Sequence, residues 1–161
     1  MTPLLGVSTT ASAATNFISW PKDVIYVQDY TANIKKADGS QMWPVRAAAE
    51  YWDNNNPVDF RYITTGCPRN SQCVPVRQKD FSDPATTGAA GYSWVRGDIT
   101  AANVDLDTSF ARLATYSQRR NVVCHELGHT LGLKHRSTTS SCLYSMNTSQ
   151  RYPDATDIKN L

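Results

Sequence analysis

The chain has 161 residues, of which 40% are hydrophobic and 19% are charged, and its formal net charge is +2 at pH 7. This length fits one domain with one core. The small net charge argues against nucleic acid or a membrane surface as a partner, and no apolar run is long enough to span a bilayer. We therefore expect a monomer that binds neither.

The first 14 residues contain a short apolar run, Leu4-Leu5-Gly6-Val7, followed by Ala11-Ser12-Ala13. Small residues in this A-x-A pattern are typical of the cleavage site of a secretory signal. The basic segment that usually begins such a signal is missing, so residues 1–14 are either a signal-peptide remnant or a disordered terminus. In both cases the folded domain is expected over residues 15–161, and the signal reading predicts a secreted, extracellular protein.

The first half of the domain alternates strand and helix patterns. Residues 24–27 are β-branched and aromatic, which predicts a strand. Ser40 is a candidate cap for a helix that runs to about Asn54, with Pro44 in its first turn. Residues 58–62 alternate apolar and polar side chains, as a half-buried strand does.

Three further strands are expected before the last long helix. Residues 74–78 form a weaker strand pattern, in which Pro75 predicts an edge or irregular position. Residues 88–95 are Gly-rich, so another backbone could approach that strand closely. Residues 102–106 alternate again. Thr115 and Gln118 form a plausible capping box for a helix over about 115–131.

This helix carries the motif that points to a function. Residues 125–135 read His-Glu-Leu-Gly-His-Thr-Leu-Gly-Leu-Lys-His and contain all three histidines of the chain. His125 and His129 lie one helical turn apart, so both imidazoles can bind one ion. Gly132 allows the chain to turn with positive φ and to bring His135 back as a third ligand. Three imidazoles suit a catalytic zinc, and Glu126 is placed to act as general base.

The extended motif and a methionine downstream resemble the metzincin zinc endopeptidases. Family members have a tight Met-turn beneath the metal, and Met146 in Ser141–Asn147 is similar to it. Histidine at position 135 and the segment Tyr152-Pro153 resemble the matrixin branch. The resemblance implies an α+β fold, with a mixed twisted sheet of four to five strands, an upper helix, the zinc-binding helix and a short C-terminal helix.

Two departures limit what the resemblance implies. Astacins and serralysins have a tyrosine two residues after the methionine, where this chain has Thr148. Many matrixins also bind a second, structural zinc through upstream histidines, and this chain has none to spare. We expect one Zn²⁺, bound by His125, His129 and His135.

Four cysteines in a secreted chain predict two disulfides. Of the three possible connectivities, we favour Cys67–Cys73, which closes a short loop, and Cys124–Cys142, which ties the zinc helix to the predicted Met-turn. A structural zinc held by all four cysteines is the competing interpretation, but their spacing lacks paired C-x-x-C knuckles.

The family also binds substrate as an extra strand along the edge of its sheet. The corresponding candidates here are Gly88, Ala89, Ala90, Gly91 and Tyr92, and the pocket wall is expected from Asn147 to Tyr152. Calcium is a further candidate ligand. The aspartates that could bind it, or serve as ordinary turn and surface residues, are Asp83, Asp98, Asp105 and Asp107.

Together these patterns predict a secreted zinc endopeptidase that hydrolyses peptide bonds in proteins or peptides with metal-activated water and Glu126 as general base. Two alternatives from other classes stay open. One is a zinc amidase that acts on a non-protein amide or a peptidoglycan peptide. The other is a binding protein that keeps the zinc fold without turnover, although such a protein has no need of Glu126.

Overall fold

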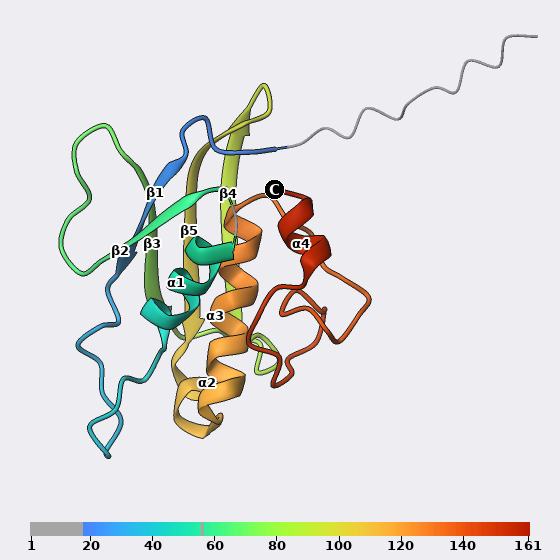
Figure 1. Cartoon of the computed structure of the whole chain (residues 1–161). Helices are drawn as coiled ribbons and strands as arrows, with labels where there is room; N and C mark the ends of the chain where they lie inside the picture. Colours follow the sequence, from blue (N-terminus) through green and yellow to red (C-terminus); the bar gives the residue numbers. More distant parts are fainter. Residues whose placement is uncertain (1–17, 56) are drawn as a thin grey trace, which may run out of the picture.

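A computed structural model describes residues 18–55 and 57–161, in which helices cover one face of a five-stranded sheet (Figure 1). The predicted leader, residues 1–14, lies outside the described residues. The elements in chain order are β1 (Val24–Asp29), α1 (Val45–Asn55), β2 (Asp59–Ile63), β3 (Gln72–Lys79), β4 (Gly88–Val95), β5 (Asp98–Asp107), α2 (Thr108–Leu113), α3 (Tyr116–Thr130) and α4 (Ala155–Lys159).

The sheet is mixed, with strand order β2-β1-β3-β5-β4. Its first four strands are parallel to one another, and β4 pairs antiparallel with β5 through a tight hairpin. This arrangement confirms the predicted α+β class and the upper estimate of five strands. It also leaves β4 at one edge of the sheet, and no other strand within residues 18–55 and 57–161 pairs with its outer side.

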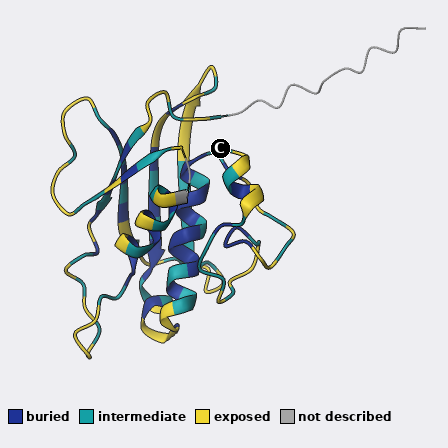
Figure 2. Ribbon diagram, in the orientation of Figure 1, coloured by how far each residue is buried: buried dark blue, intermediate teal, exposed yellow. Residues whose placement is uncertain are grey.

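The core lies between the sheet and helices α1 and α3. Burial alternates along β1, so Ile25 and Val27 point into the core while their neighbours are only partly covered. Trp43 and Trp52 are the largest fully buried side chains. Figure 2 shows α3 mostly buried, whereas β4 is exposed along much of its length. Burial of each large apolar side chain stabilises the fold by about 1.5–3 kcal/mol.

The prediction that Ser40 caps the first helix is wrong. The Ser40 hydroxyl and N–H both donate to the Asp38 carboxylate, at 2.6 and 2.9 Å, and form a local turn instead. The helix begins at Val45, and its first hydrogen bond runs from Ala48 N–H to the Pro44 carbonyl. Proline suits this position because it lacks an N–H and has a helical φ.

Of the two alternatives for Pro75, the edge strand is wrong, since β3 lies between β1 and β5, whereas an irregular position fits. The Val76 carbonyl accepts from Tyr30 N–H, so the main-chain groups of Val76 face the β1 side. Those of Pro75, one residue earlier, face the other side. Pairing with β5 starts only at Val76, so the missing N–H of Pro75 breaks no ladder bond there. Helix α2, which the sequence analysis did not predict, is capped by Asp107.

Both disulfides join the cysteines that the sequence analysis paired, Cys67–Cys73 and Cys124–Cys142, and no described cysteine is free. This pairing excludes a zinc site made of four cysteines. Across residues 18–55 and 57–161, no helix has the length and apolar character needed to cross a bilayer.

Candidate metal centre and active site

Helix α3 is bounded by the capping box and the glycine turn that its sequence predicts. Thr115 accepts from Gln118 N–H and the Gln118 side chain accepts from Thr115 N–H, which completes the predicted capping box. At the other end Gly132 has a φ of 85°. A side chain there would also collide with the carbonyl of Ile18, 2.4 Å from an ideal Cβ. This glycine turn reverses the chain and brings His135 back beside the helix.

The three histidines converge on one point. The Nε2 atom of His125 lies 3.0 Å from Nε2 of His129 and 3.1 Å from Nε2 of His135. His125 and His129 are partly buried, whereas His135 is exposed. Among the described residues, this is the one group of three or more metal-ligating side chains whose atoms come together in this way.

The hydrogen bonds of the Nδ1 atoms show which tautomer the imidazoles of His125 and His129 adopt. His125 Nδ1 lies 2.9 Å from the Cys142 carbonyl, and His129 Nδ1 lies 2.7 Å from the Leu133 carbonyl. A carbonyl can only accept, so each Nδ1 carries the proton and each Nε2 presents a lone pair. Burial, together with the charge of His129, lowers the pKa of His125 to about 4, which keeps its ring neutral. Converging lone pairs on neutral rings fit a bound cation, and three imidazoles favour zinc.

Glu126 follows the first histidine but does not join the cluster. It is 7% exposed, and this burial raises the pKa of its carboxyl to about 7, although the backbone N–H of Ala90 donates to it and opposes the shift. A carboxyl with a pKa near neutrality can both accept and return a proton at physiological pH.

Strand β4 passes directly over this helix. An ideal Cβ on Gly88 would lie 2.8 Å from Val122 Cγ1 and 3.0 Å from Glu126 Cγ, so any side chain there would displace one of them. Glycine therefore allows the strand to lie close to the general-base candidate. The N–H of Ala90 points to Glu126, away from β5, which shows that the outer edge of β4 faces the site.

A cavity of about 590 Å³ lies between this edge and α3, and the three histidines and Glu126 line it. Of the predicted substrate-binding residues, Gly88, Ala89, Ala90 and Asn147 line it as well. Gly91 and Tyr92 do not. They continue β4 beyond the cavity, and Tyr92 is exposed there.

Met146 does not have its predicted place beneath the imidazoles. Its side chain is 65% exposed at the rim of the cavity. The tight turn is instead Ser141–Tyr144, closed by a hydrogen bond from Tyr144 N–H to the Ser141 carbonyl. This turn buries Leu143 completely, and its Cδ2 lies 2.8 Å from an ideal Cβ on Gly128, next to ligand His129. Leu143 is thus the apolar side chain packed under the metal-binding helix.

Tyr152 is not part of the cavity wall either. Its ring packs on Tyr51 of α1 at 4.3 Å between centroids, with Arg120 stacked 4.9 Å from the ring centroid. It therefore fastens the C-terminal segment to α1 and α3 and does not face the histidines.

Asn121 is a site residue that the sequence analysis missed. It is 2% exposed and lines the cavity one helical turn before His125. Its Oδ1 accepts from Asn147 Nδ2 and Thr148 N–H, at 3.1 and 3.2 Å, and its Nδ2 donates to the Gln150 carbonyl at 2.6 Å. One side chain of α3 therefore holds the segment from Asn147 to Gln150, which begins at the cavity wall.

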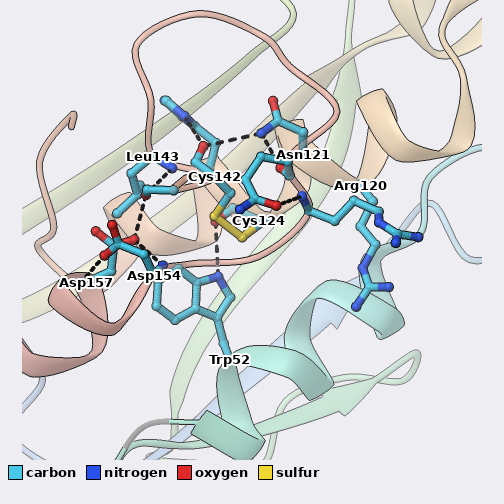
Figure 3. The surroundings of a disulfide bond; sticks show 12 residues. Trp52, Arg120, Asn121, Cys124, Cys142, Leu143, Asp154 and Asp157 are labelled. Carbon is cyan, nitrogen blue, oxygen red and sulfur yellow. Dashed lines mark hydrogen bonds between the residues drawn. A yellow bond between two sulfur atoms is a disulfide. The ribbon is translucent and has the colours of Figure 1, made fainter. Parts of the chain in front are cut away.

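The disulfide Cys124–Cys142 links α3 to the turn beneath it (Figure 3). Trp52 Nε1 donates to the Cys124 carbonyl at 3.1 Å, which adds α1 to the same cluster. On the other side of the turn, the Ser141 hydroxyl donates to the carboxylate of Asp157 in α4. The same carboxylate accepts a hydrogen bond from Arg136 Nη1 at 2.7 Å. The residue that follows His135 and the turn at Ser141 are thus tied to the same buried carboxylate.

Three of the four aspartates considered for calcium make other contacts in the structure. Asp83 accepts from Ala85 N–H and the Thr86 hydroxyl, as a turn residue does. Asp107 caps α2, and Asp105 lies 3.9 Å from Lys79. Within the described part of the chain, Asp83, Asp98, Asp105 and Asp107 do not gather into a metal-ligating group.

Comparison with known proteins agrees with this geometry. A search of curated proteins found no match to the chain. The family model for matrixin, a peptidase family, matches residues 20–160, which include all five strands, the three histidines and the loop beneath them. The chain therefore belongs to the matrixin family of zinc metallopeptidases.

Proposed function

We propose that the protein is a secreted endopeptidase that hydrolyses internal peptide bonds of proteins or peptides, with His125, His129 and His135 as ligands of a single zinc ion and Glu126 as general base. The observation that carries this proposal is the position of Glu126. It is buried beside the convergent histidines, under the free edge of β4.

In the proposed reaction, the metal ion and the protein side chains have different roles. When bound by the three Nε2 atoms, zinc lowers the pKa of a water ligand and polarises a carbonyl group. Glu126 accepts the proton of the attacking water on its carboxylate and then delivers it to the nitrogen of the leaving amine. The raised pKa of Glu126 suits both transfers. No described cysteine is available as a nucleophile, because each is in a disulfide, and the three histidines that could activate a serine converge on the proposed metal site instead.

The edge of β4 is the proposed substrate-binding surface. An extended peptide that adds to this edge gains main-chain hydrogen bonds whatever its sequence. Because the Ala90 N–H lies against Glu126, a peptide held beside Ala90 has its backbone next to the general base. The adjoining cavity, with Asn121 and Asn147 in its wall, would receive one side chain near the scissile bond.

Secretion is proposed from the two disulfides, which persist in oxidising compartments and are rare in reducing ones.

Cleavage-site profiling on a mixed peptide pool tests the proposed function. The zinc-loaded protein should cut internal bonds, lose this activity with a chelator and regain it with zinc. Glu126→Gln should lower turnover at least about 100-fold while zinc stays bound. The matched control is Glu50→Gln, since Glu50 is the only other glutamate and lies exposed on α1. Near-normal turnover in Glu126→Gln would refute the assigned role, and cleavage of non-peptide amides alone would favour an amidase.

A further inference from the structure

A second cavity, of about 1020 Å³, lies on the other side of His135. Its walls come from the tip of the β4–β5 hairpin, from the segment that follows the glycine turn and from α4, and they include Trp94, Arg96, Lys134, Arg136 and Asp157. His135 lines both cavities, so the second cavity adjoins the first at this histidine. A peptide held at the metal can therefore extend into the second cavity.

The charges around this cavity are mostly positive. Arg136 is committed to the carboxylates of Asp154 and Asp157. Arg96 and Lys134 are both exposed, and neither makes an ion pair with any residue of the described chain. The acidic group nearest in the hairpin is Asp98, which is itself exposed and pairs with Val95 in the strand register. Two cationic side chains that form no ion pair and lie close to the proposed metal site favour the binding of an anionic group.

Apolar surface accompanies these cations. Trp94 is 54% exposed, whereas large side chains of this kind are usually covered. Trp94 lines the cavity with Ile18 and Leu133. Side chains that combine a carboxylate with an aliphatic stem match this mixture of an indole ring and two cations.

The direction of β4 indicates which part of a substrate reaches this cavity. The strand runs from Gly88, beside Glu126, to Val95, beside the second cavity. Antiparallel addition is the commoner pairing at a sheet edge. A peptide in that orientation has its N-terminal part along Trp94 and Val95. At about 3.4 Å per residue, the positions about two to four residues before the scissile bond reach the cavity.

We propose that Arg96, Lys134 and Trp94 form a subsite for an acidic side chain, aspartate or glutamate, on the N-terminal side of the scissile bond. This inference rests on the proposed peptidase function and specifies the substrate class: peptides with an acidic residue ahead of the cleavage point. Arg96 and Lys134 are specificity residues that contact the substrate away from the reacting atoms.

Matched quenched peptides test the proposal. Each set differs only by Glu, Gln or Lys at the second, third or fourth position before the scissile bond. The zinc-loaded protein should cleave the best Glu peptide with a kcat/KM about fivefold above its Gln counterpart, and Lys should be the poorest. The Glu preference should weaken as salt rises, because exposed charges are screened.

Variants separate this subsite from general effects. Arg96→Glu with Lys134→Glu should invert the Glu to Lys ratio, and Arg96→Gln with Lys134→Gln should abolish the preference with less disturbance of the fold. Arg69→Glu makes the same kind of charge change on the exposed loop between β2 and β3, away from both cavities, and should leave the ratio unchanged.

The outcomes distinguish the two proposals. If the wild-type protein cleaves none of the peptides or the mixed pool, the proposed function fails. If it cleaves Glu, Gln and Lys peptides equally well, or prefers acidic residues only after the scissile bond, the subsite is wrong and the peptidase function stands. An acidic preference that survives both double variants also overturns the assignment to Arg96 and Lys134.

Discussion

His125 donates its Nδ1 proton to the carbonyl oxygen of Cys142, 2.9 Å away, and Cys142 is disulfide-bonded to Cys124, the residue just before His125. The disulfide and the hydrogen bond thus connect the same two segments, side by side. The covalent bond sets the distance between helix and turn, and the hydrogen bond sets the tautomer and orientation of the first metal ligand. We therefore expect the disulfide to support the proposed metal site as well as the fold.

Removal of this disulfide should weaken metal binding before it unfolds the sheet. In Cys124→Ser with Cys142→Ser, the zinc dissociation constant is expected to rise about 10- to 100-fold, as for the loss of other groups that orient a ligand. The bond spans 18 residues, so its loss also costs about 3 kcal/mol in the chain-entropy model. Competition with a zinc chelator, followed beside circular dichroism, measures both effects.

The other disulfide provides the control. Cys67→Ser with Cys73→Ser removes a bond of sequence separation 6 in the loop between β2 and β3, away from the histidines. Its zinc affinity should equal that of the wild type. Equal zinc affinity in both double variants would show that the Cys124–Cys142 bond stabilises only the fold.

The protein should bind one zinc ion per chain with high affinity. The prediction follows from the single group of convergent ligands in the described residues. Metal analysis of dialysed protein should give a ratio near one, and His129→Ala should lose tight binding because it removes one of three ligands. A ratio near two, or undiminished affinity in His129→Ala, would contradict the site.

Leu143, and not Met146, should support the metal-binding helix. Leu143→Ala should lower the free energy of unfolding by about 2–5 kcal/mol and weaken zinc binding, because it opens a cavity against Gly128 and Trp52. Leu143→Met conserves volume and should cost less than about 1.5 kcal/mol. Met146→Ala, at an exposed position, should change stability by no more than about 0.5 kcal/mol. Chemical denaturation measures the free energy of unfolding of the three variants, and zinc titration measures their zinc affinity.

These differences show which features of the fold and the site local sequence patterns can predict. The convergence of the three histidines, the capping box of α3 and the glycine turn depend on spacing within one helix and its end, and the structure has each of these features. The alternating strands of the sheet were also predicted, because burial of one face imposes a period of two. Boundaries that depend on competing local hydrogen bonds, such as Ser40 with Asp38, were not predicted correctly.

Tertiary contacts were harder to predict. Nothing in the order of residues shows that the turn after the third histidine closes at Tyr144, which buries Leu143 and leaves Met146 exposed. Tyr152 was assigned to the pocket wall by its distance from the motif, whereas its stacking on Tyr51 depends on how α1 packs. Asn121 did have a signal, since it lies four residues before His125 and therefore on the same face of the helix.

Asn121 should control which side chains the cavity accepts. Asn121→Ala leaves the Gln150 carbonyl and Thr148 N–H without their partner, a loss of about 1–3 kcal/mol, and frees the loop that carries Asn147. We expect KM to rise and the cleavage-site profile to broaden, with kcat less affected, because Asn121 holds the wall and not the reacting atoms. Asn121→Asp keeps the acceptor to Thr148 and should recover part of the selectivity. Asn54→Ala, an exposed change on α1, is the control. An unchanged profile in Asn121→Ala, or a fall in kcat with KM unaltered, would show that Asn121 does not shape the pocket.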